Sequence, residues 1–397
     1  MINERSGGNA RIWTREFLSI FLANLLLYLG QFMVQPLITT YAAELGAEAA
    51  TLGFVAGAFA VTAIIFKVFS GPAIDCLNRK YVLAGAIIIL SVAFFGYSIS
   101  TNVTLVIIFR FLQGAGQAFT ATCCLALAAD ALPQEKISSG LGVFALAQVA
   151  AQAVSPAIGL FIGEHFGFRV SFITGGIVLL TSVLLALQIR TKPPAVKKQF
   201  KISFSNTISI PSLLPAFLLL LNLCCFCLIN SYLVLYALEL NIANIGSFFT
   251  IYAVALIISR PLLGKWSDKY GFIAVTIPGL IVYAFSFFVI SYAHTLPMFF
   301  LAAFLSAVGS GASQPMMNSL CMKTVPQDRR GAASSTAYIG MDIGNIIGPI
   351  IAGIVASRYG YSFMWRIMTV FLFISVVVIL IFRKKIMQIE NVFGGKS

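Results

Sequence analysis

The sequence predicts an all-α membrane protein whose twelve transmembrane helices form two pseudo-symmetric six-helix bundles. Hydrophobic residues make up 59% of its 397 residues and charged residues only 10%, whereas soluble domains have about 25% charged residues. Twelve apolar stretches each hold the roughly 20 residues that cross a hydrocarbon layer. The two halves of the chain also repeat each other at a constant spacing of 193 residues.

Each apolar stretch is expected to be a helix, because a strand exposed to lipid cannot satisfy its backbone hydrogen bonds. The frequent prolines and glycines agree with this, since both are common in membrane helices. The predicted spans are 16–38, 51–71, 81–100, 104–128, 138–163, 168–189, 213–238, 244–264, 273–293, 297–321, 332–356 and 361–382.

The repeat aligns the halves without a gap. Gly71 falls on Gly264, and Lys67 falls on Arg260. One register held over about a hundred residues indicates a duplicated unit, and such repeats are typical of proteins whose halves move around a shared site. Other equivalent pairs are Asp75 and Asp268, Gly116 and Gly309, Pro156 and Pro349, and Gly167 and Gly360.

The longest polar stretch between spans is 190–212, which is rich in lysine and serine. It is predicted to be a cytoplasmic linker between a first half, 1–189, and a second half, 213–397, that ends in a short cytoplasmic tail. No stretch is long enough for a soluble domain, and no glycine-rich phosphate-binding motif occurs. These observations argue against an ATPase or an appended enzyme.

The net charge of +13 follows the membrane topology. With the N-terminus inside, all but four of the 26 lysines and arginines lie in or beside cytoplasmic segments; the exceptions are Arg110, Arg169, Arg358 and Arg366. This bias predicts an inner or plasma membrane protein with both termini in the cytoplasm. The basic charge then attracts anionic lipid, and no nucleic-acid partner is expected.

Six of the seven cysteines lie within predicted spans, so a disulfide framework is not expected. Cys224, Cys225 and Cys227 diverge around one helix and have no nearby histidine. No metal site and no cofactor are therefore predicted.

Two related loops are predicted to act as a gate. Glycine permits close helix approach, and aspartate at a helix end can face the positive N-terminus of another helix. In the first copy Asn78 stands where a glycine is expected, and asparagine also tolerates the left-handed conformation. The gate residues are Gly71, Asp75, Arg79 and Lys80 in the first copy and Gly264, Asp268, Lys269 and Gly271 in the second.

Two further motifs lie inside spans. Arg110, Gln113 and Gln117 share one helix face, and a cation at that depth is costly unless it meets a cavity or a polar partner. The alternative is an arginine that extends to the outer headgroups. A predicted helix-hinge motif comprises Ser155, Pro156 and Gly159, and its repeat comprises Gly348, Pro349 and Gly353.

Together these motifs resemble the major facilitator superfamily over nearly the whole chain. The gate loops depart from the family pattern at Cys76, Asn78 and Phe272, and the hinge motif departs at Ser155 and Leu160. The resemblance is strongest to the twelve-helix drug:proton antiporters. It implies a secondary active transporter that works by alternating access. It also implies that Asp75 faces the start of helix eleven and that Asp268 faces the start of helix five, as latches.

Asp342 is the predicted proton-coupling residue. It lies about ten residues into its span, near the middle of the bilayer. A carboxyl group inside a membrane indicates function, and loss of hydration favours its protonated form. Tyr338, Asp342 and Asn345 share one helix face. The alternative role is a structural hydrogen bond to a neighbouring helix.

Polar side chains on several other spans are predicted to line a substrate cavity, although such groups also join membrane helices. The full set is Asn24, Tyr28, Gln31, Arg110, Gln113, Gln117, Gln148, Gln152, Asn222, Asn230, Ser310, Gln314, Tyr338 and Asn345.

The function predicted from the sequence is proton-coupled export of small amphipathic organic compounds by a monomer. One alternative is proton-coupled uptake of a metabolite or organic anion, with Arg110 as the partner of the anion. Another is a sensor on the same scaffold that does not transport. A membrane enzyme is disfavoured, because the spans contain no clustered histidines, paired acids or nucleophile arrangement.

Overall fold

The computed structural model describes residues 13–133, 136–189, 208–326 and 330–393. Regular structure in these ranges is α-helical, apart from the short 3-10 helix η3 (Ile210–Ser212). The first half contains α1 (Arg15–Glu44), α2 (Ala49–Cys76), α3 (Arg79–Ile99), α4 (Val103–Ala131), α5 (Ile137–Phe166) and α6 (Phe168–Gln188). The second contains α7 (Leu213–Glu239), α8 (Gly246–Tyr270), α9 (Phe272–Ser291), α10 (Leu296–Lys323), α11 (Arg330–Ile381) and α12 (Arg383–Phe393).

The predicted twelve-span fold is confirmed. Eleven helices in the described ranges are long and apolar enough to cross a membrane. The eleventh, α11, contains the last two predicted spans, which join at a kink at Gly360. The short helix α12 follows them and was not anticipated from the sequence.

The kink at Gly360 has an equivalent in the first half. Gly360 has φ 80° and ψ 164°, and its repeat partner Gly167, between α5 and α6, has φ 86° and ψ 158°. Both conformations favour glycine, since a Cβ atom is strained at positive φ. Each half therefore turns from its fifth span to its sixth at one glycine.

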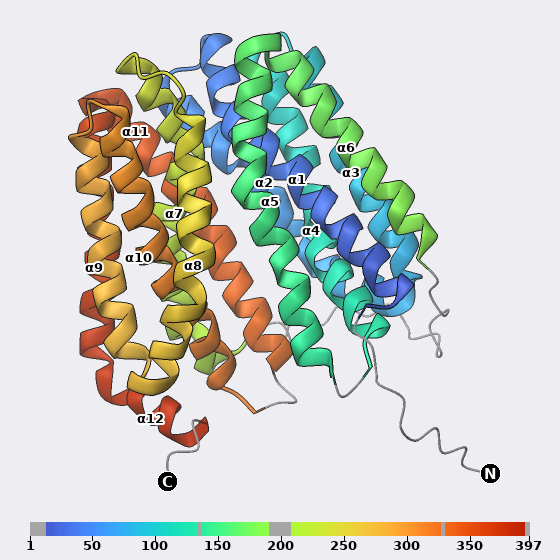
Figure 1. Cartoon of the computed structure of the whole chain (residues 1–397), viewed down its shortest axis with the longest axis vertical. Coiled ribbons are helices and arrows are strands. Elements are labelled where there is room, and N and C mark those ends of the chain that lie inside the picture. The colour runs from blue at the N-terminus through green and yellow to red at the C-terminus, as the bar shows by residue number, and fades with distance from the viewer. Residues whose placement is uncertain (1–12, 134–135, 190–207, 327–329, 394–397) are drawn as a thin grey trace.

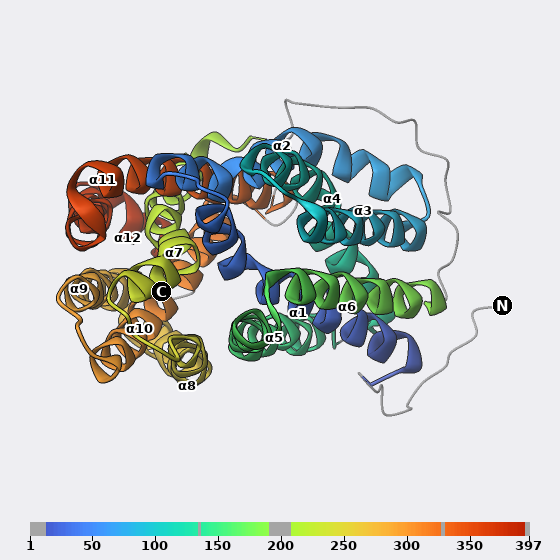
Figure 2. The same cartoon turned by 90° about the horizontal axis from the view of Figure 1, so that it is seen from above.

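The helices form two groups that lie side by side (Figure 1). In the first group α1 packs against α5 and α6, and α4 packs against α2 and α3. In the second, α7 packs against α11, and α10 packs against α8 and α9. The groups meet where α2 contacts α11, α5 contacts α8 and α1 contacts α7, as Figure 2 shows from above.

The end of the bundle at which α1 begins and α12 lies is called the terminal end, and the opposite end is the distal end (Figure 1). Close backbone contacts join α2 and α11 toward the distal end. A Cβ atom at Gly53 would lie 2.3 Å from the Pro349 carbonyl oxygen, and one at Gly353 would lie 2.4 Å from the Ala49 oxygen. The Tyr232 hydroxyl of α7 donates to the Ala49 oxygen of α2 at 3.5 Å across the groups, and to the Pro349 oxygen at 2.9 Å within the second group. The two groups are therefore packed tightly along this distal seam.

The second half carries a cap on one of its own helices. Glu390 of α12 accepts a hydrogen bond from the Phe272 N–H at the start of α9, at 2.7 Å. A carboxylate is stabilising at that position, because the first N–H groups of a helix have no partner within it. Ile386 is fully buried and anchors α12.

The distal seam generates the first prediction. Gly53→Ala is expected to disfavour this arrangement by about 1–3 kcal/mol, because the added methyl group meets backbone atoms. Ala157 lies opposite Gly246 of the other group, so the substitution Ala157→Cys places a reporter cysteine at the contact. This cysteine should react faster with maleimide in the Gly53→Ala protein, once the labelling of the same protein without the reporter cysteine is subtracted. Gly85→Ala is the matched control, since a Cβ atom at Gly85 has nothing within 4 Å. Equal labelling in both variants would contradict a closed seam at Gly53.

Candidate functional site

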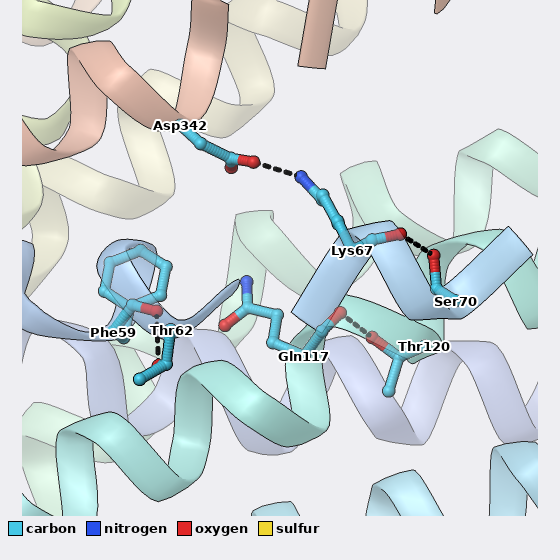
Figure 3. Close-up of polar contacts among 7 residues, drawn as sticks. All are labelled: Phe59, Thr62, Lys67, Ser70, Gln117, Thr120 and Asp342. Atoms are coloured by element: carbon cyan, nitrogen blue, oxygen red, sulfur yellow. Dashed lines mark hydrogen bonds and ion pairs between the residues drawn. The ribbon is translucent and has the colours of Figure 1, made fainter. Parts of the chain in front are cut away.

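An ion pair joins the two groups of helices near the middle of the bundle. The Lys67 Nζ atom on α2 donates a hydrogen bond to Asp342 Oδ2 on α11. Figure 3 shows the two side chains pointing toward one another, and both lie roughly 14–18 Å from the terminal ends of their helices at 1.5 Å per residue. The Lys67 side chain is 26% exposed and that of Asp342 is 11% exposed. This is a charged contact held largely away from water.

Tyr338 completes this cluster. Its ring lies 5.1 Å from Lys67 Nζ, one turn before Asp342 on α11. The predicted stripe of Tyr338 and Asp342 therefore meets a cation from the other half of the chain. Asn345, the third member of the stripe, is half-buried, and its backbone oxygen lies 3.4 Å from a Cβ atom built at Gly57.

Sequence reasoning did not single out Lys67 as a site residue. Its charge was counted with the basic residues near cytoplasmic loops, although it lies about two turns inside its helix. The alignment of Lys67 with Arg260 could have identified it as a site residue. Each repeat has a cation at this position inside an apolar span, and a cation inside a membrane span indicates function.

Arg110 is buried and links α4 to α2. Its Nε atom donates to the Val55 oxygen at 2.8 Å, Nη1 donates to Gln113 Oε1 at 2.9 Å, and Nη2 donates to the Ala56 oxygen. The guanidinium also lies 4.5 Å from the centre of the Phe59 ring. Arg110 therefore does not extend to the headgroups, and its nitrogen atoms are occupied within the first half.

Several predicted cavity residues form hydrogen bonds between helices. Asn222 of α7 donates to Ser313 of α10 at 2.8 Å, and the hydroxyls of Tyr252 and Ser310 lie 2.8 Å apart. Asn222 Oδ1 and Gln31 Nε2 are buried and have no hydrogen-bond partner among the described residues. These two polar atoms therefore lie in the protein interior without a hydrogen-bond partner in the described ranges.

The other predicted cavity residues differ in exposure, and their role as a lining stays a prediction. In the view of Figure 3, Gln117 of α4 is drawn below the ion pair, and its backbone oxygen accepts a hydrogen bond from the Thr120 hydroxyl at 3.0 Å. Asn24 and Asn230 are buried, Tyr28, Gln117, Gln152 and Gln314 are half-buried, and Gln148 and Tyr338 are exposed.

The gate motifs lie at the terminal end of the bundle. Arg79 pairs with Asp130 at 2.5 Å within the first half, and Lys80 donates to the Leu187 oxygen at 3.1 Å. The placement of Gly71 and of the Asp75 side chain is outside what the structure describes. Asp268 is exposed, and the Lys269 amine lies 5.0 Å from the Tyr270 ring. The two proposed latches therefore stay predictions.

The reason given for Asn78 was wrong. Its φ is −69°, and it caps α3 by accepting a hydrogen bond from the Lys80 N–H. The close helix approach expected at Gly264 is also wrong, because a Cβ atom there would meet nothing within 4 Å. Gly271, the repeat partner of Asn78, has φ 90°. Asparagine therefore serves at this position as an N-cap rather than as a left-handed residue.

The two hinge motifs permit close helix packing. A Cβ atom at Gly159 would lie 1.9 Å from the Met33 oxygen of α1, and one at Gly348 would lie 2.5 Å from the Cys224 oxygen of α7. Ser155 donates to the Ala151 oxygen at 2.5 Å, next to Pro156. In the second copy, Pro349 and Gly353 also contact the other half across the distal seam.

Comparisons with known proteins agree with this geometry. A family model described as Major Facilitator Superfamily matches residues 20–243 and 216–391. The chain belongs to the major facilitator superfamily. It is thus a multi-pass membrane transporter with a small-molecule substrate, and not an enzyme.

Similar proteins include exporters. The multidrug resistance protein MdtG of Escherichia fergusonii is 26% identical over 368 residues, covering 88% of this chain and 90% of that protein. The staphylopine export protein of Staphylococcus aureus is 23% identical over 389 residues, covering 93% and 96%. The solved structure of the nucleoside transporter NupG has a TM-score of 0.75 at 16% identity, covering 94% and 99%. The predicted resemblance to the drug-exporter branch is confirmed.

The Arg110 contacts generate the second prediction. Arg110→Lys should destabilise the protein nearly as much as Arg110→Ala, because one ammonium group cannot replace the planar guanidinium at three acceptors. Each lost hydrogen bond to a charged group contributes about 1.5–3 kcal/mol. Thermal unfolding of the purified variants checks this, with Arg169→Lys at an exposed position of α6 as the control. A melting temperature for Arg110→Lys equal to that of the wild type would contradict the role as a link between α4 and α2.

Proposed function

We propose that this transporter exports small amphipathic organic compounds in exchange for protons. The observation that carries the proposal is the ion pair between Lys67 and Asp342, because it connects a carboxyl group deep in the bundle to the contact between the two halves. The similarity to the staphylopine export protein supports the direction of transport.

The coupling step follows from the charges. Protonation of Asp342 removes the negative partner of Lys67 and so weakens the tie between α2 and α11. The free energy of the contact between the halves then depends on proton binding, which is the differential affinity that a coupled conformational change requires. Proton binding to Asp342 and substrate binding would then favour different states of this contact.

Alternating access is proposed for the halves 1–189 and 213–397, joined by the segment 190–212. In the proposed topology both termini are cytoplasmic and the protein lies in the inner or plasma membrane. The distal end then faces outward. Close packing of Gly53 and Gly353 along the seam accordingly corresponds to the state whose outer side is closed.

The proposed partners are the substrate, protons and the lipid bilayer, and the proposed working unit is a monomer. The proposed substrate cavity contains amides and hydroxyls, of which Gln31 and Asn222 retain free polar atoms. Such a lining suits amphipathic molecules, because a few polar contacts orient a ligand that is otherwise held by apolar groups.

The third prediction tests the coupling residue. Asp342→Asn should abolish uphill transport driven by a proton gradient in proteoliposomes, since the amide cannot bind and release a proton at working pH. Downhill exchange should persist. An Asp342→Asn protein that concentrates substrate to the wild-type ratio would exclude Asp342 as the coupling group.

The fourth prediction separates coupling from stability. Asp342→Asn leaves the Lys67 charge without its partner. The destabilisation should be smaller than the cost of about 3–5 kcal/mol for a fully buried pair, because the Lys67 side chain is 26% exposed. Adding Lys67→Gln should restore much of the thermal stability, yet transport should stay uncoupled. Recovery of gradient-driven accumulation in the double variant would show that the pair is structural.

A further inference from the structure

Arg260 on α8 occupies the position in the second half that Lys67 occupies in the first. Each cation lies four residues before the glycine of its gate motif. Lys67 pairs with Asp342 of α11, but the residue equivalent to Asp342 in the first half is Val149 of α5. Both halves therefore have a cation at this position, but only the second half has the acid.

The structure gives Arg260 no ion pair and no hydrogen bond among the described residues. Its Nε atom is buried and has no acceptor. The stem of the side chain lies against α10, where its Cγ atom is 3.6 Å from a Cβ atom built at Gly311. The Arg260 stem thus packs against the helix that also carries Ser310 and Gln314 of the proposed cavity.

The neighbouring polar groups do not neutralise this charge. The hydroxyls of Tyr252 and Ser310 bond to each other, and Ser259 donates to the Leu256 oxygen at 3.4 Å. The only acid of α8 is Asp268, which is exposed about two turns further along at the terminal end, and α10 contains none. Asp342 is already paired with Lys67.

A guanidinium inside a membrane span is costly unless it meets an anion, a polar partner or a water-filled cavity, and Arg260 has no acceptor among the described residues although its side chain keeps some exposure. We infer that the substrate supplies the anion: the transported compounds are organic anions whose carboxylate, or a similar anionic group, binds Arg260. The planar guanidinium suits such a group, since its parallel N–H donors match the two oxygens of a carboxylate. Arg110 is unsuited to this role because its donors are engaged by α2 and Gln113.

This inference rests on the proposed function, since it names the substrate class of the same transporter. It also gives the two equivalent cations, Lys67 and Arg260, different roles. Lys67 holds the titratable acid, and Arg260 holds the substrate. The pseudo-symmetric frame thereby presents one site for a proton and another for an anion.

Binding of a matched probe series to the purified full chain in nanodiscs, without any gradient, tests the inference. The probes are radiolabelled naphthoate, its neutral amide naphthamide and the cation naphthylmethylamine. Wild-type protein should bind naphthoate about tenfold or more tightly than naphthamide. Arg260→Gln should reduce naphthoate binding to the level of naphthamide while leaving naphthamide binding unchanged, and Arg260→Lys should retain part of the preference.

Arg358→Gln is the control, because it removes a charge from an exposed position of the same half. Unchanged naphthamide binding by Arg260→Gln shows that the variant is folded. Equal binding of the three probes by the wild type, binding of none of them, or an unchanged preference in Arg260→Gln would overturn the anion site. A charge preference without gradient-driven transport would leave this inference intact while the proposed function fails.

Discussion

A charged side chain inside an apolar layer needs a partner, and this constraint organises the centre of the molecule. Backbone carbonyls of α2 and the Gln113 side chain accept hydrogen bonds from the Arg110 guanidinium and stabilise its charge. Arg110 thereby joins two helices of one half. Lys67 instead meets Asp342 of the other half. The same physical requirement therefore produces a permanent link in one case and a contact that proton binding can weaken in the other.

The distal seam and the central ion pair act on the same two helices. Glycines at the distal end allow the backbones of α2 and α11 to touch, and such packing is either intact or lost, because tightly packed surfaces do not deform gradually. The ion pair lies further along the same helices, where both partners keep some exposure. In the proposed mechanism, a change in charge at the centre would shift the choice between two packed arrangements.

The spans were predictable because hydropathy is a local property. The repeat aligned Gly167 with Gly360, but nothing in the sequence showed that the fifth and sixth spans of each half turn at these glycines. Asp342 was identified by its depth alone. Its partner was not, since nothing local says which face of α2 meets α11 across the two halves. The acceptors of Arg110 were missed for the same reason, because backbone carbonyls of a distant helix leave no trace in the sequence. The conformation of Asn78 was misjudged because its repeat partner is a glycine, Gly271, which is left-handed. The Asn78 side chain instead caps α3, and its backbone is extended.

The single-glycine turns at Gly167 and Gly360 have a mechanical consequence. A connection of one residue has no slack, so the fifth and sixth spans of each half cannot slide far past one another where they join. Each pair is tied together at an elbow on the distal surface. Because α5 and the first arm of α11 both contact the opposite half, a displacement at either interface is carried around the elbow to the outer flank of its own bundle, where the surrounding lipid must accommodate it.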